Sequence, residues 1–302
     1  MRYRLDIAYD GTDFCGWQRQ FATPTASPAL ILPAASPDAR AELRTVQALV
    51  EHAVREAVRE PVTVVGASRT DSGVHALAQC AAFSTTDDRR GPADERLALA
   101  INARLPDDVV VTRCVPAHPR FDPIGHCAAK GYRYLLHNAH DKPLWNRRYV
   151  HHIVPPLDLD AMRDAAARLV GTHDFAAFAA AGHGRASTVR TVFACDAARL
   201  DERTIAIDIS GDGFLWNMVR IVAGTLMHAG LGRLTPDDVS AALASRDRRL
   251  AGPTLPPTGL RLEWIRYPAG VEQPDADLPE PHSGRDEEQS QEHPPADTIS
   301  TA

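Results

Sequence analysis

Apolar and polar positions in the first third of the chain follow the order strand, helix, strand, strand, helix, strand. Alternation of polar and apolar side chains indicates half-buried strands, and apolar spacing of three and four residues indicates helices. The pattern therefore predicts a βαββαβ unit over residues 1–116. Its segments are a strand at 2–9, a helix at 45–58, strands at 62–66 and 77–84, a helix at 93–103 and a strand at 108–115.

The same order recurs in residues 117–267 without any repeat of the sequence itself. A turn at Asp201 and Glu202 separates the middle two strands of this second unit. We predict an α+β fold with two ferredoxin-like halves, mostly antiparallel sheets and a central cleft. The segments of the second half are a strand at 129–137, a helix at 158–170, strands at 189–198 and 203–210, helices at 215–229 and 235–245, and a strand at 260–267.

Two segments lack the periodicity of packed structure. Residues 21–44 contain four prolines, and residues 268–302 combine proline with Glu, Asp, Gln and Ser and few apolar side chains. Such compositions bury too little apolar surface to offset the entropy of ordering the chain. We expect a long surface insertion at 21–44 and a disordered acidic tail at 268–302.

A net charge of −6 is unusual for a protein with a nucleic-acid partner, but the excess acid lies in the tail. From Pro268 onward there are nine acidic residues and one basic residue, Arg285, so residues 1–267 carry 30 acidic and 32 basic side chains. Of the 33 basic residues, 31 are arginine, which suits phosphate contact, although an arginine-rich genome gives the same bias. RNA therefore remains a possible partner.

Several other classes of protein are disfavoured. No apolar run approaches the roughly 20 residues that span a bilayer, and the N-terminus lacks the apolar core of a signal peptide, so we expect a cytoplasmic protein without membrane contact. The five cysteines are scattered without a C-x-x-C pair, and the histidines lack cysteine partners at zinc-finger spacing. The sequence predicts no disulfide framework and no metal site.

An unusual loop joins the second and third strands of the first half, in the string VVGASRTDSGVHALAQCAAF. Asp71 lies two residues after Arg69 and four before His75, and the strands on both sides would hold its carboxylate rigidly. Gly66 and Gly73 permit tight backbone there. By itself, R-T-D-S-G is also compatible with a simple Asx-turn beside a surface arginine.

The longer string R-T-D-x-G-V-H-A at 69–76 resembles the catalytic motif of the tRNA pseudouridine synthase A family. Six more stretches resemble the family in the same order, so the resemblance covers roughly residues 2–20 and 45–267. They are YDGTDFCGWQRQ (9–20), INARLPDDV (101–109), KGYRYLLHN (130–138), GTHDFAAF (171–178), GFLWNMVRIVAGTLMHAGLGR (213–233) and GLRLEWIRYP (259–268).

The resemblance implies a role for four residues. Asp71 corresponds to the essential aspartate, and Arg220 to the basic residue that pairs with it. Arg69 corresponds to the arginine that helps displace the target base, and Tyr132 to the aromatic residue that packs on the uracil. An aspartate is ionised at neutral pH, and a buried arginine partner would lower its pKa further.

The implied reaction isomerises uridine to pseudouridine in tRNA. The N1–C1′ bond breaks, the uracil turns and C5 joins C1′, so a carboxylate is needed at the sugar as a nucleophile or as a base. No redox change or group transfer occurs, and we expect no cofactor. The family's usual targets are uridines 38 to 40 of the anticodon arm, and its usual assembly is a homodimer.

The chain departs from the family pattern in a few places. Ser68 stands where many relatives have glycine, Ser72 where alanine is common, and 214–216 read Phe-Leu-Trp. The insertion at 21–44 separates GWQRQ from the following helix, which relatives join closely. We regard the three substitutions as tolerated variants. The insertion leaves the local RNA contact surface open, but it does not change the expected reaction.

Two other classes of function match parts of the sequence. An aspartyl-nucleophile phosphatase needs D-x-D-G-T, but the aspartate before Asp10 is Asp6, which excludes that spacing. A catalytically silent RNA-binding protein on the same fold is expected to lose Asp71, Tyr132 or Arg220, and this chain keeps all three.

Three further interpretations rest on the residues themselves. Trp17 and its neighbours Gln18 and Arg19 fit RNA contact and a buried tryptophan equally well. A structural hydrogen bond is favoured for His75. Asn217 and Arg220 form a polar pair at i, i+3 that a buried helix would not keep without partners, which favours a site.

Overall fold

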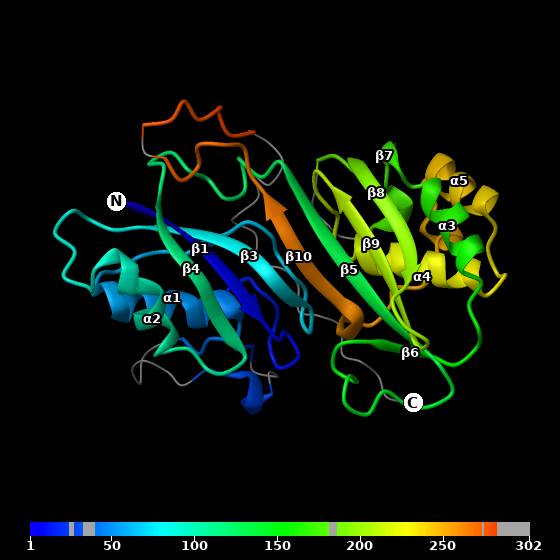
Figure 1. Ribbon diagram of the computed structural model, residues 1–302, viewed down its shortest axis with the longest axis horizontal. Helices are drawn as coiled ribbons and strands as arrows, with labels where there is room; N and C mark the ends of the chain where they lie inside the picture. Colours follow the sequence, from blue (N-terminus) through cyan, green and yellow to red (C-terminus); the bar gives the residue numbers. More distant parts are fainter. Residues whose placement is uncertain (24–26, 33–39, 181–185, 274, 283–302) are drawn as a thin grey trace.

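The computed structural model describes residues 1–302 except 24–26, 33–39, 181–185, 274 and 283–302. A single ten-stranded sheet runs through the molecule in the order β4-β1-β3-β10-β5-β9-β8-β7, with β2 paired to β3 and β6 to β5. Figure 1 shows α1 and α2 at one end of the molecule and α3, α4 and α5 at the other. The strands are β1 (Arg2–Tyr9), β2 (Val65–Gly66), β3 (His75–Ser84), β4 (Val109–Ala117), β5 (Ala129–Asn138), β6 (His151–Ile153), β7 (Gly171–Asp174), β8 (Val189–Arg199), β9 (Thr204–Gly211) and β10 (Leu260–Arg266). The helices are α1 (Val46–Val58), α2 (Asp94–Asn102), α3 (Leu159–Ala167), α4 (Met218–Gly230) and α5 (Pro236–Ser245), with short 3-10 turns at Pro28–Leu30, Ala176–Phe178, Arg248–Leu250 and Pro257–Gly259.

Both halves of the sheet have the strand order of a ferredoxin-like unit. The first half reads β4-β1-β3-β2 and the second reads β10-β5-β9-β8, and the neighbouring strands in each of these two orders are antiparallel. Strands β3 and β10 join the halves through a short parallel pairing at His75 with Arg261 and Ala76 with Leu262. The predicted α+β fold is confirmed.

The main core lies between the sheet and the helices. Alternate residues of β1 are buried there, including Leu5 and Ile7, and they belong to the same cluster as Val50 and Val54 of α1. Helix α1 begins where the Thr45 side chain accepts a hydrogen bond from the backbone N–H of Ala48. The alternation in β1, the apolar spacing in α1 and the N-cap of α1 therefore all favour the same packing of this helix on this sheet.

The predicted helices and strands are all present, with shifts at their ends. The helix predicted at 215–229 begins at Met218, because Asn217 adopts the left-handed conformation with φ of 60° and ψ of 4°. Strands β6 and β7 were not predicted. Both are short and pair with a longer neighbour, and such pairing leaves little trace in the residue pattern.

The insertion at 21–44 contains more pairing than its composition suggested, although 24–26 and 33–39 lie outside the described residues. Isolated bridges join Phe21 to Glu42 and Ile31 to Leu43, and Leu32 is buried. The expectation of an unpacked insertion is therefore wrong for these parts. Backbone pairing between the two ends of the segment supplies the order that its residue pattern does not.

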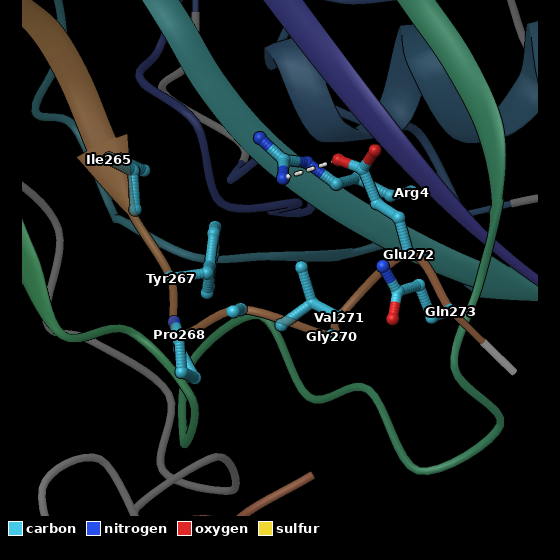
Figure 2. Close-up of a pocket in the computed structure, with 9 residues that line it drawn as sticks. Arg4, Ile265, Tyr267, Pro268, Gly270, Val271, Glu272 and Gln273 are labelled. Atoms are coloured by element: carbon cyan, nitrogen blue, oxygen red, sulfur yellow. Dashed lines mark hydrogen bonds and ion pairs between the residues drawn. The ribbon is translucent and has the colours of Figure 1, made fainter. Parts of the chain in front are cut away.

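The expectation of a disordered tail is also wrong for residues 268–273 and 275–282, whereas 274 and 283–302 lie outside the described residues. Val271 and Leu278 are 5% and 2% exposed, in a second cluster with Cys80 and Ala82 of β3. Figure 2 shows the pocket that this segment forms beside β1, where Glu272 pairs with Arg4. Two apolar anchors and ion pairs hold this part of the tail against the sheet.

The tail and the main core lie on opposite faces of β3. Ala81 and Phe83 belong to the main core with the helices, and the alternating residues Cys80 and Ala82 contact the second cluster. Since successive side chains of a strand point to opposite faces, the first half is covered on both sides. No helix within the described ranges is long and apolar enough to cross a membrane.

Candidate active site

Asp71 lies in a loop, residues 67–74, that leaves β2 and enters β3. The Ser68 amide donates to Gln79 Oε1 at 3.2 Å, and Gln79 Nε2 donates back to the Ser68 carbonyl at 2.5 Å. The Val74 amide donates to the Asp71 carbonyl at 3.1 Å. The loop is therefore tied to β3 at Ser68, and a turn from Asp71 to Val74 leads it into that strand.

The segment at residues 14–17 packs against this loop. The Trp17 amide donates to the Thr70 carbonyl at 3.0 Å. Glycine is needed at position 16 because its φ is 86° and because a Cβ there would come within 2.7 Å of that carbonyl. A Cβ on Gly66 would meet the Trp17 indole at 2.3 Å. Trp17 is 1% exposed, so the buried interpretation of this residue is confirmed.

Arg220 of α4 reaches the loop from the second half of the molecule. Its Nη1 lies 3.5 Å from Asp71 Oδ2, and the same nitrogen donates to Asn217 Oδ1 at 2.7 Å. Its Nε donates to the Leu255 carbonyl at 2.6 Å. These two acceptors fix the guanidinium. Asn217 lies in the left-handed conformation at the start of α4, where its side chain can accept this hydrogen bond.

Tyr132 of β5 contacts the loop and is 7% exposed. Its hydroxyl is 2.8 Å from Ser68 Oγ, and its ring meets Phe214 edge to face with centroids 5.3 Å apart. Lys130 Nζ, two residues earlier on β5, donates to the Ala67 carbonyl at 3.3 Å. The second half thus supports the loop of the first half through both charged and aromatic side chains.

Burial and nearby charge act together on Tyr132. Burial raises the pKa of its hydroxyl well above the ordinary value, the Ser68 hydrogen bond opposes that rise, and the charge of Asp71 adds to it. The hydroxyl is therefore neutral at physiological pH. Tyr132 can offer a ring and a neutral hydrogen-bonding group, but no negative charge, next to the Asp71–Arg220 pair.

The remaining two residues of the motif occupy different environments. Arg69 is exposed between buried Ser68 and Thr70. His75 is 4% exposed, and the Gly11 amide donates to its Nδ1 at 3.0 Å, which agrees with a structural role. Burial lowers the pKa of His75, and the nearby Asp10 carboxylate acts in the opposite direction.

The structure brings Asp71, Arg220 and Tyr132 together, with Arg69 on the exposed side of the same loop. Sequence reasoning missed Gln79, Phe214 and the hydroxyl of Ser68, since their partners are distant in sequence and only the fold makes them neighbours. Within the described part of the chain, no group of three or more His, Cys, Asp or Glu side chains could hold a metal ion.

Two ferredoxin-like halves in one sheet, with the R-T-D-S-G-V-H loop at their joint, define the pseudouridine synthase class of RNA-modifying isomerases. Residues 34–123 and 165–268 match the tRNA pseudouridine synthase family, and the chain belongs to that family.

Known relatives resemble nearly the whole folded part of the chain. It is 39% identical over 271 residues to tRNA pseudouridine synthase A 2 of Clostridium tetani, covering 87% of this chain and 98% of the relative. It is 40% identical to tRNA pseudouridine synthase A of Thermoanaerobacter sp., covering 86% and 97%, and 36% identical to that of Acetivibrio thermocellus, covering 87% and 98%. A solved archaeal box H/ACA sRNP Nop10-Cbf5 complex is similar over 82% of this chain and 69% of that one, at 11% identity and a TM-score of 0.30, which is too low to support an argument.

Proposed function

We propose that this chain isomerises uridine to pseudouridine in tRNA, with Asp71 as the catalytic carboxylate. The family to which the chain belongs and the names of its relatives support the substrate and the reaction. The observation that carries the residue assignment is the 3.5 Å approach of Arg220 Nη1 to Asp71 Oδ2 across the joint of the two halves.

Asp71 acts at the ribose, as the nucleophile at C1′ or as the base at C2′. Arg220 keeps the carboxylate charged and aimed, since two further acceptors hold the guanidinium in place. Tyr132 supports the uracil while its N1–C1′ bond breaks and the C5–C1′ bond forms, and Arg69 helps displace the base from its stack. A stacking platform of this kind offsets the few kcal/mol that a flipped base costs, at about 1–3 kcal/mol per base.

The atoms of the substrate balance without an external reagent. C5 of the uracil loses a proton when it bonds to C1′, and N1 gains a proton after it leaves, so the product is an isomer of the substrate. Nothing is oxidised or reduced. We therefore assign no cofactor to this reaction.

The proposal extends to the setting of the reaction. The motif resemblance supports uridines 38 to 40 of the anticodon arm as targets and a homodimer as the assembly, and a tRNA substrate fits the cytoplasm as the compartment. We also propose that residues 1–116 and 117–267 act as two halves, with the RNA received in a cleft between them and 268–302 as an appended tail. The site supports this division, because Asp71 belongs to one half and Arg220 to the other.

Asp71→Asn tests the assignment, because it keeps the shape of the side chain and removes its charge. We expect tRNA binding within a few-fold of the unaltered protein and no detectable pseudouridine after incubation with unmodified tRNA. Asp107→Asn, which alters an exposed carboxylate before β4, is the matched control and should leave turnover unchanged. Turnover by Asp71→Asn above a trace would refute the role of Asp71, and tRNA binding without turnover by the unaltered chain would point to a non-catalytic RNA-binding protein.

A further inference from the structure

The loop at residues 141–149, between β5 and β6, exposes an unusual amount of apolar surface. Among the described residues, Trp145 is the most exposed large hydrophobic side chain, at 88%, and its neighbour Leu144 is 63% exposed. Exposed aromatic surface of this size in a water-soluble fold commonly marks a binding site.

The same loop is basic. It contains Lys142, Arg147 and Arg148 against a single acidic residue, Asp141, whose carboxylate pairs with Arg203 of the β8–β9 turn at 2.6 Å. Trp145 therefore lies in a loop with three cations, of which Arg148 is paired with Asp13 at 3.4 Å. The one carboxylate of the loop is paired with Arg203. Phosphates are the complementary partner of such a surface.

Both ends of the loop are fixed, and one end is fixed next to the active-site loop. The Tyr149 hydroxyl donates to Asp10 Oδ2 at 2.8 Å, and the Tyr149 ring lies 5.1 Å from the ring of His75, centroid to centroid. His75 is the first residue of β3 and follows directly on the loop that carries Asp71. An RNA that enters the active site would therefore pass close to this basic aromatic loop.

We propose that the loop at residues 141–149 is an RNA-contact element in which Trp145 stacks on an unpaired base of the tRNA outside the target uridine. Lys142, Arg147 and Arg148 contact phosphates on either side of that base. The inference rests on the proposed function, since it takes tRNA as the substrate. Its physical basis is separate, because it depends on the exposure and charge of this loop.

RNA fits this loop better than a second copy of the chain does. A symmetric contact between two copies of the loop would bring like charges together around the two tryptophan rings, which is unfavourable. Stacking on a base accepts any nucleotide and needs only one exposed ring, whereas a protein interface needs a much larger complementary area.

Binding of unmodified full-length tRNA to the Asp71→Asn protein tests the inference without turnover. Adding Trp145→Ala should weaken binding about 5- to 150-fold, the range expected for one stacked base. Adding Trp145→Phe should retain most of the affinity. Leu99→Ala, which removes a 72% exposed apolar side chain from α2, is the matched control outside the loop and should change affinity little.

A salt series separates stacking from charge. Trp145→Ala should leave the slope of log affinity against log salt unchanged, whereas Lys142→Ala should make it shallower by about 1. Equal affinities for the Trp145→Ala protein and its parent would overturn the inference. So would a Trp145→Ala protein that binds tRNA normally but changes oligomeric state in sedimentation, since that result would assign the ring to a contact between copies. Pseudouridine formation by the unaltered chain is measured separately, so a failure of the proposed function is recognised independently.

Discussion

The β2–β3 connection and the β8–β9 connection occupy the same place in the two ferredoxin-like halves, but they differ in form. In the second half, β8 and β9 pair along almost their whole length and close in a tight turn, where the Leu200 amide donates to the Thr204 carbonyl at 2.9 Å. In the first half, β2 pairs with β3 only at Val65 and Gly66, and the chain then leaves the sheet as the Asp71 loop.

Shortening one hairpin has two consequences. The first residues of β3 are left unpaired by β2, and β10 of the second half pairs there instead, at His75 and Ala76. The loop that replaces the missing strand lies at this joint, within reach of Arg220 and Tyr132 from the other half. The same topology occurs in both halves, and the candidate site lies in the half whose hairpin is open.

Arg220→Ala should break this arrangement most strongly. It removes the charge that the second half directs at Asp71, so turnover should fall about 100- to 1,000-fold, as for other preorganised electrostatic contacts, while tRNA affinity changes far less. Single-turnover rates at saturating enzyme, with binding measured across a salt series, provide the test.

Two further variants complete this test. Arg220→Lys should recover part of the rate, because a point charge restores the field without the planar fork. Arg199→Ala, at an exposed end of β8, is the control and should leave the rate unchanged. Near-normal chemistry of Arg220→Ala with a shallower salt slope would instead place Arg220 on the phosphate backbone.

Tyr132→Ala should have the next largest effect. Removing the ring costs the support of about 1–3 kcal/mol that it gives the base, which corresponds to a loss of about 5- to 150-fold in turnover. Tyr132→Phe should keep most activity, since it loses only the hydrogen bond to Ser68, worth about 1 kcal/mol to stability. Equal losses in both variants would assign the function to the hydroxyl, and parallel measurement of thermal unfolding identifies any loss that comes from the fold.

The four candidate site residues could be proposed from the sequence mainly because the strings around them resemble a known family. The pattern alone left R-T-D-S-G compatible with an Asx-turn, and it marked Asn217 and Arg220 as a polar pair beside the apolar residues of their helix. The 3.5 Å contact between Asp71 and Arg220 and the Ser68–Tyr132 hydrogen bond could not be derived from periodicity, since they depend on how β3 and β10 register across the joint.

The tail was mispredicted for a related reason. Its average composition resembles that of a disordered chain, but composition averages over the two buried side chains that anchor it, Val271 and Leu278. Glu272 of the tail forms ion pairs with Arg4, near the N-terminus, and with Arg113 of β4, both of which are distant from it in the sequence. Only the folded sheet places these arginines where the tail can reach them.

Ending the chain after Tyr267 should therefore destabilise the protein. This truncation exposes the face of β3 that the tail covers in the first half of the molecule. Losing two buried aliphatic side chains costs about 3 kcal/mol or more. The free energy of unfolding in urea provides the measurement. Ending the chain after His282 is the control, because it keeps both anchors and should leave the unfolding midpoint unchanged. Identical stability of the two truncated chains would mean that the anchors contribute nothing.

Asp201→Ala should have the smallest effect and tests the other side of the comparison. If the β8–β9 turn only connects its strands, the variant should keep full turnover and lose a little stability, because Asp201 Oδ1 accepts hydrogen bonds from the amides of Arg203 and Thr204, each at 2.8 Å. The hydrogen bond from the Arg203 amide and then that from Thr204 lower the pKa of Asp201 below its ordinary value. The pKa of Asp201 is therefore lower in the folded state than in the unfolded state. Its ionised carboxylate contributes its full stabilisation at a pH above the unfolded-state pKa, and this stabilisation is lost as the pH falls through the folded-state pKa. Urea midpoints of the two proteins should thus differ at neutral pH and converge in acid below about pH 4.

A loss of turnover in Asp201→Ala with unchanged stability would show that the second hairpin also takes part in the reaction, and the two halves would then differ less than their structures suggest.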